Sequence, residues 1–203
     1  FHQALSRHVE TGTTAWGLEF PHSVSPLVKM VGPMMWNESN YEPISNVLRD
    51  WFESVESNYG VVVYISFGTN LQHFRKTMKK LYGRLCNNHN RQGNVWFLWS
   101  LARNTTSEKD LDVFVSCKEH LRIERWVPQQ SILNRPSVRL FVSHGGANSV
   151  HESLAEAVPV IVVPLGLDQF DVAARLEAVG AGIKITSSPI SSNKRNFIFF
   201  LKR

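Results

Sequence analysis

The sequence has 203 residues, of which 43% are hydrophobic and 19% are charged. This length and composition are typical of a globular chain with a sizeable core, and they exclude collagen-like, low-complexity and disordered proteins. The net charge is +5, but the Lys and Arg residues are scattered and form no basic stripe interleaved with aromatic residues. We therefore expect no nucleic-acid partner.

The two cysteines, Cys86 and Cys117, have neither a CxxC spacing nor a neighbouring His pair, so they do not indicate a zinc site. Two isolated buried thiols are expected, and a single disulfide stays open. No signal peptide is visible, and no apolar run reaches the ~20 residues that cross a bilayer. Because the chain starts at Phe1 and looks cut at both ends, membrane association is expected only through segments outside it.

The first expected elements come before residue 60. A short apolar run at residues 28–31 predicts a strand that ends at the Gly-Pro turn of residues 32–33. Residues 34–45 are rich in Asn, Pro and Ser and are interpreted as a linker. Apolar residues then recur at helical intervals over residues 46–57, which predicts a short amphipathic helix.

Beyond residue 60, short apolar runs alternate with helical patterns. Strands are expected at residues 61–67, 95–99, 121–127, 138–143, 158–165 and 182–186, and helices at 71–87, 148–157 and 169–179. Strands that are apolar on both faces and alternate with helices imply a parallel sheet covered on both sides. Right-handed crossovers then give an α/β, Rossmann-like, doubly wound domain. Ligands of such sheets bind beyond the carboxyl ends of the strands.

One of the loops at that rim combines glycines with polar side chains. Residues 144–149, with the sequence HGGANS, follow a predicted strand and open a predicted helix. Gly146 and its neighbour let the backbone approach a ligand closely, and the first helical N–H groups have no partner inside the helix. Together with the helix dipole, this favours a phosphate site. The side chains of His144, Asn148 and Ser149 can donate further hydrogen bonds to a diphosphate.

Glu152 lies on the same predicted helix face as Asn148 and Ser149. A carboxylate there suits ribose hydroxyls better than phosphates, because like charges repel. The alternative is a common strand–Gly-Gly–helix turn in which Asn148 and Ser149 act as ordinary helix caps. The segment has neither the full G-x-G-x-x-G pattern of dinucleotide folds nor a P-loop.

The two flanking loops carry candidate binding residues as well. In the preceding loop, an exposed Trp126 would offer a stacking face to a base and Gln129 would bond its edge. The alternative is a Trp packed in the core. In the following loop, Asp168 and Gln169 start a helix, and this pair suits the vicinal hydroxyls of a sugar. The alternative is an Asp that simply caps the helix.

Taken together, these motifs resemble the donor-binding signature of UDP-glycosyltransferases in order and spacing. The matching residues are Trp126-Val127-Pro128-Gln129, Ile132-Leu133, His144-Gly145-Gly146, Asn148-Ser149, Glu152, Val158-Pro159, Pro164 and Asp168-Gln169. Residues 64–69 resemble the first strand and turn of the same domain, and residues 16–21 and 31–33 resemble the approach to its interdomain linker. The resemblance covers most of residues 13–185. Ala147 departs from the Trp or Thr usual there, and the pattern fails after Ile185.

The resemblance implies a GT-B fold, with this chain supplying the C-terminal domain and a tail of the N-terminal one. It also implies ten donor-binding residues: Thr69, Trp126, Gln129, His144, Gly146, Asn148, Ser149, Glu152, Asp168 and Gln169. Trp126 would stack on uracil, Gln129 would bond it, and Glu152 would take the ribose hydroxyls. Asp168 and Gln169 would hold the transferred sugar, and the others would hold the diphosphate.

The reaction of the family is inverting transfer of a hexosyl group from a UDP-sugar to an acceptor hydroxyl. The general base, a His–Asp pair, lies near the start of the N-terminal domain, and His2, His8 and His22 do not match that motif. The acceptor pocket lies on that domain too, so we expect the chain to be inactive alone. No metal or other cofactor is expected beside the UDP-sugar.

Four regions are expected along the chain. Residues 1–33 would be the tail of the acceptor domain, 34–59 the linker and short helix, 60–186 the nucleotide-sugar-binding domain, and 187–203 a divergent or truncated tail. The resemblance does not name the sugar or the acceptor. Location depends on the branch of the family, since animal-type members face the lumen of the endoplasmic reticulum and plant-type members are cytoplasmic.

Three other functions were compared with the sequence. A non-catalytic nucleotide-binding relic would keep the donor residues without the reaction. A nucleic-acid-binding domain conflicts with the dispersed charge. An NAD-dependent oxidoreductase needs a glycine fingerprint after the first strand and an acidic residue ~20 residues further on, and residues 68–71 supply neither.

Overall fold

The computed structural model describes residues 10–12, 17–20, 22–23, 25–35, 37–68, 94–101 and 120–185. The helix expected at residues 71–87, both cysteines and the expected tail from residue 187 lie outside these described residues.

The main sheet is parallel and has six strands in the order β5-β4-β3-β6-β7-β8. They are β3 (Val61–Ser66), β4 (Val95–Ser100), β5 (Leu121–Glu124), β6 (Val138–Ser143), β7 (Val160–Val162) and β8 (Gly182–Lys184). All six predicted strands are confirmed, and β6 has the predicted bounds. Each of the others ends one to three residues earlier or later than predicted, and β7 also begins two residues later, so β5 and β7 are the most shortened. The ladder of β5 ends where Ser100 of β4 pairs with Glu124, so the residues that follow turn away from the sheet.

The strand order places the first strand of the sheet, β3, at its centre. The chain moves outward from β3 through β4 to β5, then returns to the other side of β3 with β6 and moves outward again through β7 and β8. The direction in which successive strands are added to the sheet therefore reverses between β3 and β6, although the strands themselves are parallel. This is the doubly wound arrangement, and its ligands bind at the carboxyl edge near the point of reversal.

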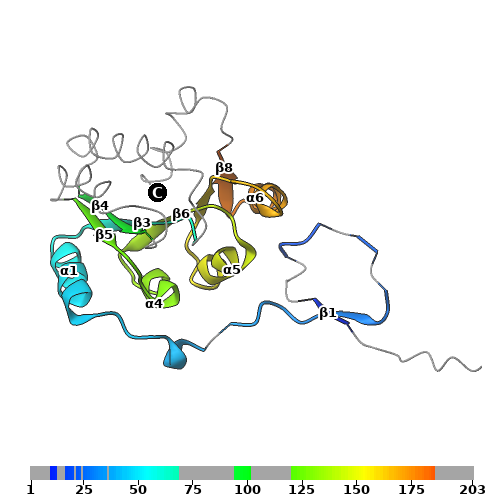
Figure 1. Ribbon diagram of the computed structural model, residues 1–203, viewed down its shortest axis with the longest axis horizontal. Helices are drawn as coiled ribbons and strands as arrows, with labels where there is room; N and C mark the ends of the chain where they lie inside the picture. Colours follow the sequence, from blue (N-terminus) through cyan, green and yellow to red (C-terminus); the bar gives the residue numbers. More distant parts are fainter. Residues whose placement is uncertain are drawn as a thin grey trace, which may run out of the picture.

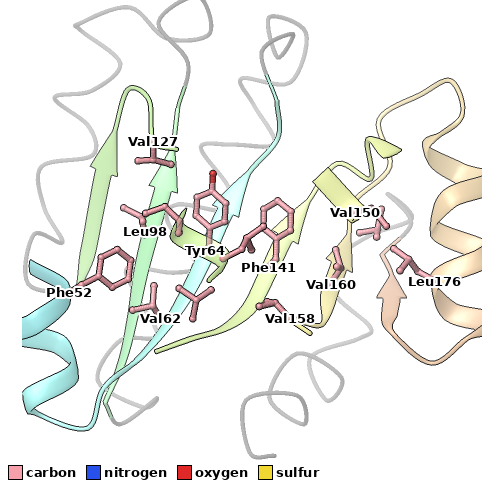
Figure 2. Close-up of a cluster of buried hydrophobic side chains, with 14 of the residues drawn as sticks. Phe52, Val62, Tyr64, Leu98, Val127, Phe141, Val150, Val158, Val160 and Leu176 are labelled. Carbon is pink, nitrogen blue, oxygen red and sulfur yellow. The ribbon is translucent and has the colours of Figure 1, made fainter. Parts of the chain in front are cut away.

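Both faces of the central strand are buried, as its continuous apolar sequence predicts. Val62 and Tyr64 of β3 belong to one hydrophobic cluster, and Val63 and Ile65 belong to a second one. Alternation along a strand directs these pairs to opposite faces of the sheet. Figure 2 shows the first cluster, in which the rings of Tyr64 and Phe141 stack with centroids 5.0 Å apart.

Helices cover the face of the sheet that carries the first cluster. Figure 1 shows α1 (Asn46–Ser57), α4 (Gln129–Leu133) and α5 (Ala147–Ala155) along this face, with α6 (Gln169–Ala178) beside β8. The prediction for α1 is confirmed at both ends. Ser45 caps its start, and the Ser45 hydroxyl accepts from the Leu48 amide at 3.3 Å. Helices α5 and α6 begin and end within two residues of the predicted bounds. The short α4 was not predicted.

The segment before α1 contains little regular structure. A 3-10 helix, η1 (Glu38–Asn40), lies in the predicted linker, and β2 (Val28–Met30) pairs in parallel with β1 (Glu10–Gly12), a strand that the sequence did not predict. Figure 1 shows β1 apart from the main sheet. Several contacts join this segment to the main sheet and its helices. Leu18 is buried in the first cluster, and Glu19 forms an ion pair with Arg175 of α6. Within the described residues, no helix is long and apolar enough to cross a membrane.

Candidate donor-binding site

A pocket of about 440 Å³ opens at the carboxyl edge of the sheet, in the half of the sheet that contains β3, β4 and β5. Its walls come from the ends of β3 and β4, the loop after β5, helices α4 and α5, and the linker. The lining residues are Asn40, Glu42, Tyr64, Ser66, Gly68, Ser100, Arg125, Trp126, Val127, Pro128, Gln129, Gln130, Ser131, Ser149 and Glu152. Its size is that of a small-molecule site.

Trp126 stands exposed at the mouth of this pocket. Its side chain is 69% accessible, whereas its neighbour Val127 is buried. The alternative of a Trp packed in the core is therefore wrong. Because β5 ends at Glu124, the loop lifts the indole out of the sheet and leaves its face open to a ligand.

Gln129, at the start of α4, connects the pocket wall to α5. Its amide nitrogen donates to Oε2 of Glu152 at 2.6 Å and to the hydroxyl of Ser149 at 3.0 Å. Its amide oxygen accepts from the hydroxyl of Tyr64 at 3.2 Å. Both ends of the carboxamide therefore bind protein groups, which the sequence did not indicate for a residue expected to bond a base.

Glu152 brings a carboxylate into this partly buried surface. Burial raises the pKa of Glu152 above its ordinary value of 4.5, and the hydrogen bond from Gln129 acts in the opposite direction. Its Oε2 atom accepts from Gln129, so Oε1 is the oxygen left to accept from the hydroxyls of a ligand in the pocket.

The turn between β6 and α5 is built so that the backbone lies close to its surroundings. The hydroxyl of Ser143 accepts from the amide of Gly145 at 3.1 Å, and Gly145 has a φ of +89°, which only glycine adopts without strain. Gly146 is the N-cap of α5 and offers no side chain to its free N–H groups. Asn148 and Ser149 lie inside the first turn of α5, so they do not cap it, and the capping alternative is wrong for both.

His144 packs between two glycines at this turn. A methyl group on Gly146 would lie 2.6 Å from Nε2 of the imidazole, and one on Gly68 would lie 3.1 Å from Cε1. Burial lowers the pKa of His144, while Asp168 and the backbone of Ser66 act in the opposite direction. The ring is thus held between the ends of β3 and β6 and is neutral near pH 7.

Asp168 and Gln169 occupy the next loop along the sheet, between β7 and α6. Asp168 is at the N-cap of α6, but its side chain makes no capping hydrogen bond, so the capping alternative is wrong here as well. Its carboxylate is exposed and close enough to influence His144. The amide oxygen of Gln169 accepts from the backbone N–H groups of Leu165 and Gly166 at 2.8 and 3.1 Å. Its amide nitrogen is the group left for a ligand.

The predicted residues thus form two groups. Four of them line the pocket, namely Trp126, Gln129, Ser149 and Glu152. Five others lie at or after the ends of β6 and β7 without lining it: His144, Gly146, Asn148, Asp168 and Gln169. Thr69 lies outside the described residues.

Several lining residues were missed in the sequence. Ser66 and Ser100 are the last residues of β3 and β4, and a polar residue at the carboxyl end of a buried strand is a signal that identifies this rim. Tyr64 carried no such signal, because it lies within a continuous apolar run and reads as core. Asn40 and Glu42 come from the predicted linker, and no local pattern relates them to the sheet.

The described residues contain no group of three or more His, Cys, Asp or Glu side chains that could hold a metal ion. The polar groups that they bring to this edge are amides, hydroxyls, an imidazole, the guanidinium of Arg125 and separate carboxylates. These groups suit hydrogen bonding to a polyhydroxylated, phosphorylated ligand.

Comparison with known proteins points to one family. The family model described as "UDP-glucoronosyl and UDP-glucosyl transferase" matches residues 6–196. UDP-glycosyltransferase 1 of Phaeomoniella chlamydospora is 32% identical over 188 residues, which cover 89% of this chain and 37% of that protein. Human UDP-glucuronosyltransferase 2B7 is 27% identical over 178 residues, which cover 88% of this chain and 31% of that protein.

Solved structures share the fold. Os79 from O. sativa in complex with UDP has a TM-score of 0.58 and 25% identity, covering 70% of this chain and 30% of that one. A second Os79 structure, in a complex that includes trichothecene, has a TM-score of 0.64 and 24% identity, covering 78% of this chain and 35% of that one. Os79 is a GT-B glycosyltransferase, which agrees with the predicted fold class.

The chain therefore spans about a third of the length of the curated relatives that it matches. The family match extends over nearly all of it, and the sheet order and the GT-B likeness agree with that match. This chain belongs to the UDP-glucoronosyl and UDP-glucosyl transferase family.

Proposed function

We propose that the pocket beside Trp126 binds the uridine part of a UDP-sugar. The observation that carries this proposal is the exposed indole of Trp126 in the same pocket as the hydrogen-bonded pair of Gln129 and Glu152. An open indole face stacks on a base, and a carboxylate oxygen accepts from ribose hydroxyls. Gln129 borders the base and ribose and holds Glu152 in place.

The diphosphate then lies along the β6–α5 turn. The free N–H groups at the start of α5, with Gly146 as N-cap, favour a negative charge there. The side chains of His144, Asn148 and Ser149 add hydrogen bonds, and Thr69 would do so from the loop after β3. In this arrangement, hydrogen-bond donors of the protein stabilise the negative charge that builds on the departing UDP.

The hexose continues toward the loop between β7 and α6. Asp168 offers an exposed carboxylate that caps nothing, and Gln169 offers its amide nitrogen. A carboxylate and an amide donor together suit the vicinal hydroxyls of a sugar. In this order, base, diphosphate and hexose follow the strand ends from β5 across β3 and β6 to β7.

The complete reaction is transfer of that hexose to an acceptor hydroxyl with inversion at the anomeric carbon. We assign residues 60–186 to donor binding, 34–59 to the linker and 1–33 to the end of an acceptor domain, with residues 187–203 as a tail. The relatives are about three times as long as the matched part, which supports a general base and an acceptor pocket outside this chain. One Os79 complex includes trichothecene, which supports a small organic acceptor.

Saturation-transfer NMR with UDP and ADP tests the donor site. UDP is expected to receive saturation at the uracil H5 and H6 protons in the wild-type chain and to lose it in Trp126→Ala. The control is Tyr59→Ala, because Tyr59 is 93% exposed and does not line the pocket. Equal saturation of ADP and UDP, or no effect of Trp126→Ala, would contradict a uridine site.

Transfer activity tests the division of labour. The purified chain, given UDP-sugars and a panel of hydroxylated acceptors, is expected to release no UDP above the rate of spontaneous hydrolysis. Glycosylated product from the chain alone would contradict the assignment of the base and acceptor pocket to other parts of the protein.

A further inference from the structure

The proposed donor contacts make no use of the hydroxyl of Tyr64, a residue that lines the pocket. Tyr64 lies in the middle of β3, and its side chain is only 1% accessible, yet the residue lines the pocket. Figure 2 shows its hydroxyl directed toward the carboxyl ends of the strands, the end at which Val127 lies. The ring therefore belongs to the core, while the hydroxyl reaches the floor of the site.

The hydrogen bonds around this hydroxyl run in one direction. The side chains of Ser66 and Ser100 lie close to the Tyr64 hydroxyl and oppose the rise in its pKa. Tyr64 donates to the amide oxygen of Gln129 at 3.2 Å. The amide nitrogen of Gln129 then donates to Glu152 at 2.6 Å and to Ser149 at 3.0 Å. The chain of donors thus ends on the Glu152 carboxylate.

This polarity fixes which way the Gln129 carboxamide faces. An amide turned by half a revolution would present its oxygen to the Glu152 carboxylate, where both groups only accept. It would also leave the Tyr64 hydroxyl without its acceptor. Aligned donors strengthen one another in a partly buried site. Burial also raises the pKa of Tyr64, so its hydroxyl keeps its proton over the whole working range of pH.

From this geometry we infer that Tyr64 is a positioning residue for ribose recognition, acting through Gln129 to aim the Glu152 carboxylate at the ribose hydroxyls. The inference rests on the proposed function, because it takes the pocket to hold uridine. In this role Tyr64 acts on the ligand through Gln129. It holds Gln129 in the orientation that leaves one oxygen of Glu152 free for the ligand.

The test compares UDP with 2′-deoxy-UDP, which lacks one of the hydroxyls that Glu152 would read. Calorimetric titration of the full chain is expected to show tighter binding of UDP. Tyr64→Phe keeps the ring stacked on Phe141 and removes the hydroxyl that donates a hydrogen bond to Gln129. UDP binding should therefore weaken by about three- to tenfold. Binding of 2′-deoxy-UDP should change less than about twofold, so that the preference for UDP falls. Tyr59→Phe, at an exposed site away from the pocket, serves as the matched control and should keep the preference.

A second variant distinguishes relay through Gln129 from a general loss of packing. Gln129→Met removes the relay and leaves Tyr64 intact, and it should reduce the preference for UDP on its own. Adding Tyr64→Phe to Gln129→Met should then change nothing further, since the two residues act on Glu152 in series. Thermal unfolding of each variant reports any change in stability separately from the preference.

The outcomes separate this inference from the proposed function. A wild-type chain that binds no UDP overturns both. A chain that binds UDP and 2′-deoxy-UDP equally, a Tyr64→Phe variant with the wild-type preference, or an effect of Tyr64→Phe that persists without Gln129 overturns the role of Tyr64 and leaves the UDP site standing.

Discussion

At the scale of single residues, Glu152 shows how a binding site opposes stability. Its carboxylate lies in a partly buried pocket, and burial raises its pKa above the ordinary value of 4.5. The folded state therefore binds a proton at this group more readily than the unfolded state does. The protonated carboxyl contributes fully to the free energy of unfolding at low pH, and this contribution is lost as the pH rises through the folded-state pKa.

Replacing Glu152 with Gln removes that opposition while keeping an acceptor for Gln129. At pH 7 we expect the free energy of unfolding of Glu152→Gln to rise by up to about 1 kcal/mol, although UDP binds more weakly. Denaturant titration and calorimetry on the same samples measure the two effects. A variant that is less stable than the wild type at pH 7 would contradict the cost assigned to the buried carboxylate.

The pH dependence of uridine binding follows from the same group. Ionised Glu152 accepts from ribose hydroxyls, so uridine affinity should fall as the pH drops through the raised pKa of Glu152, at a higher pH than an ordinary glutamate would give. Uridine is chosen instead of UDP because protonation of His144 would strengthen phosphate binding and oppose the trend. In Glu152→Gln the dependence should disappear, and its persistence would assign the titration to another residue.

At the scale of elements, the turn between β6 and α5 decides where the diphosphate donors lie. Glycine at position 146 makes room for the imidazole of His144, since a methyl group there would come within 2.6 Å of Nε2. The same glycine is the N-cap of α5. The orientation of His144 and the entry into the helix are thus set by one residue without a side chain.

Gly146→Ala should therefore weaken phosphate binding without affecting the base. We expect UDP affinity to fall by roughly tenfold, which corresponds to the loss of a hydrogen bond to a charged group, and uridine affinity to stay near that of the wild type. Gly166→Ala is the matched control, because a methyl group on Gly166 meets no atom within 4 Å. Equal losses for uridine and UDP would show that the turn, and not the diphosphate contact alone, has been disrupted.

Most of the elements could be predicted from the sequence, because apolar runs and helical periodicity report burial directly. The bounds of α1 and β6 are those predicted. The short α4 was missed because five residues carry too little periodicity, and β1 because its pairing with β2 is not a local property. The site followed the same division. Trp126 was predicted from its place after a strand and Glu152 from its helical spacing to Asn148 and Ser149, whereas the inferred role of Tyr64 depends on contacts among residues far apart in the chain.

At the scale of the whole molecule, the sheet order brings the proposed ligand groups to one edge. All strands run parallel, the order in which the chain adds them reverses between β3 and β6, and the candidate residues follow β3, β5, β6 and β7 at their carboxyl ends. The linker adds a further wall through Asn40 and Glu42. A hydrogen bond holds the linker next to these two residues, because the hydroxyl of Tyr41 donates to Glu156 at 2.7 Å. This contact raises the pKa of Tyr41 to about 12.

Calorimetric titration of UDP into the full chain, with a chelator present, tests the account most directly. We expect one UDP to bind per chain, and we expect Trp126→Ala to weaken it by ~1–3 kcal/mol, the range for stacking of one base. Glu152→Ala should weaken it independently. Absence of UDP binding by the wild-type chain, or affinity that both variants leave unchanged, would contradict the assignment of this pocket to the donor.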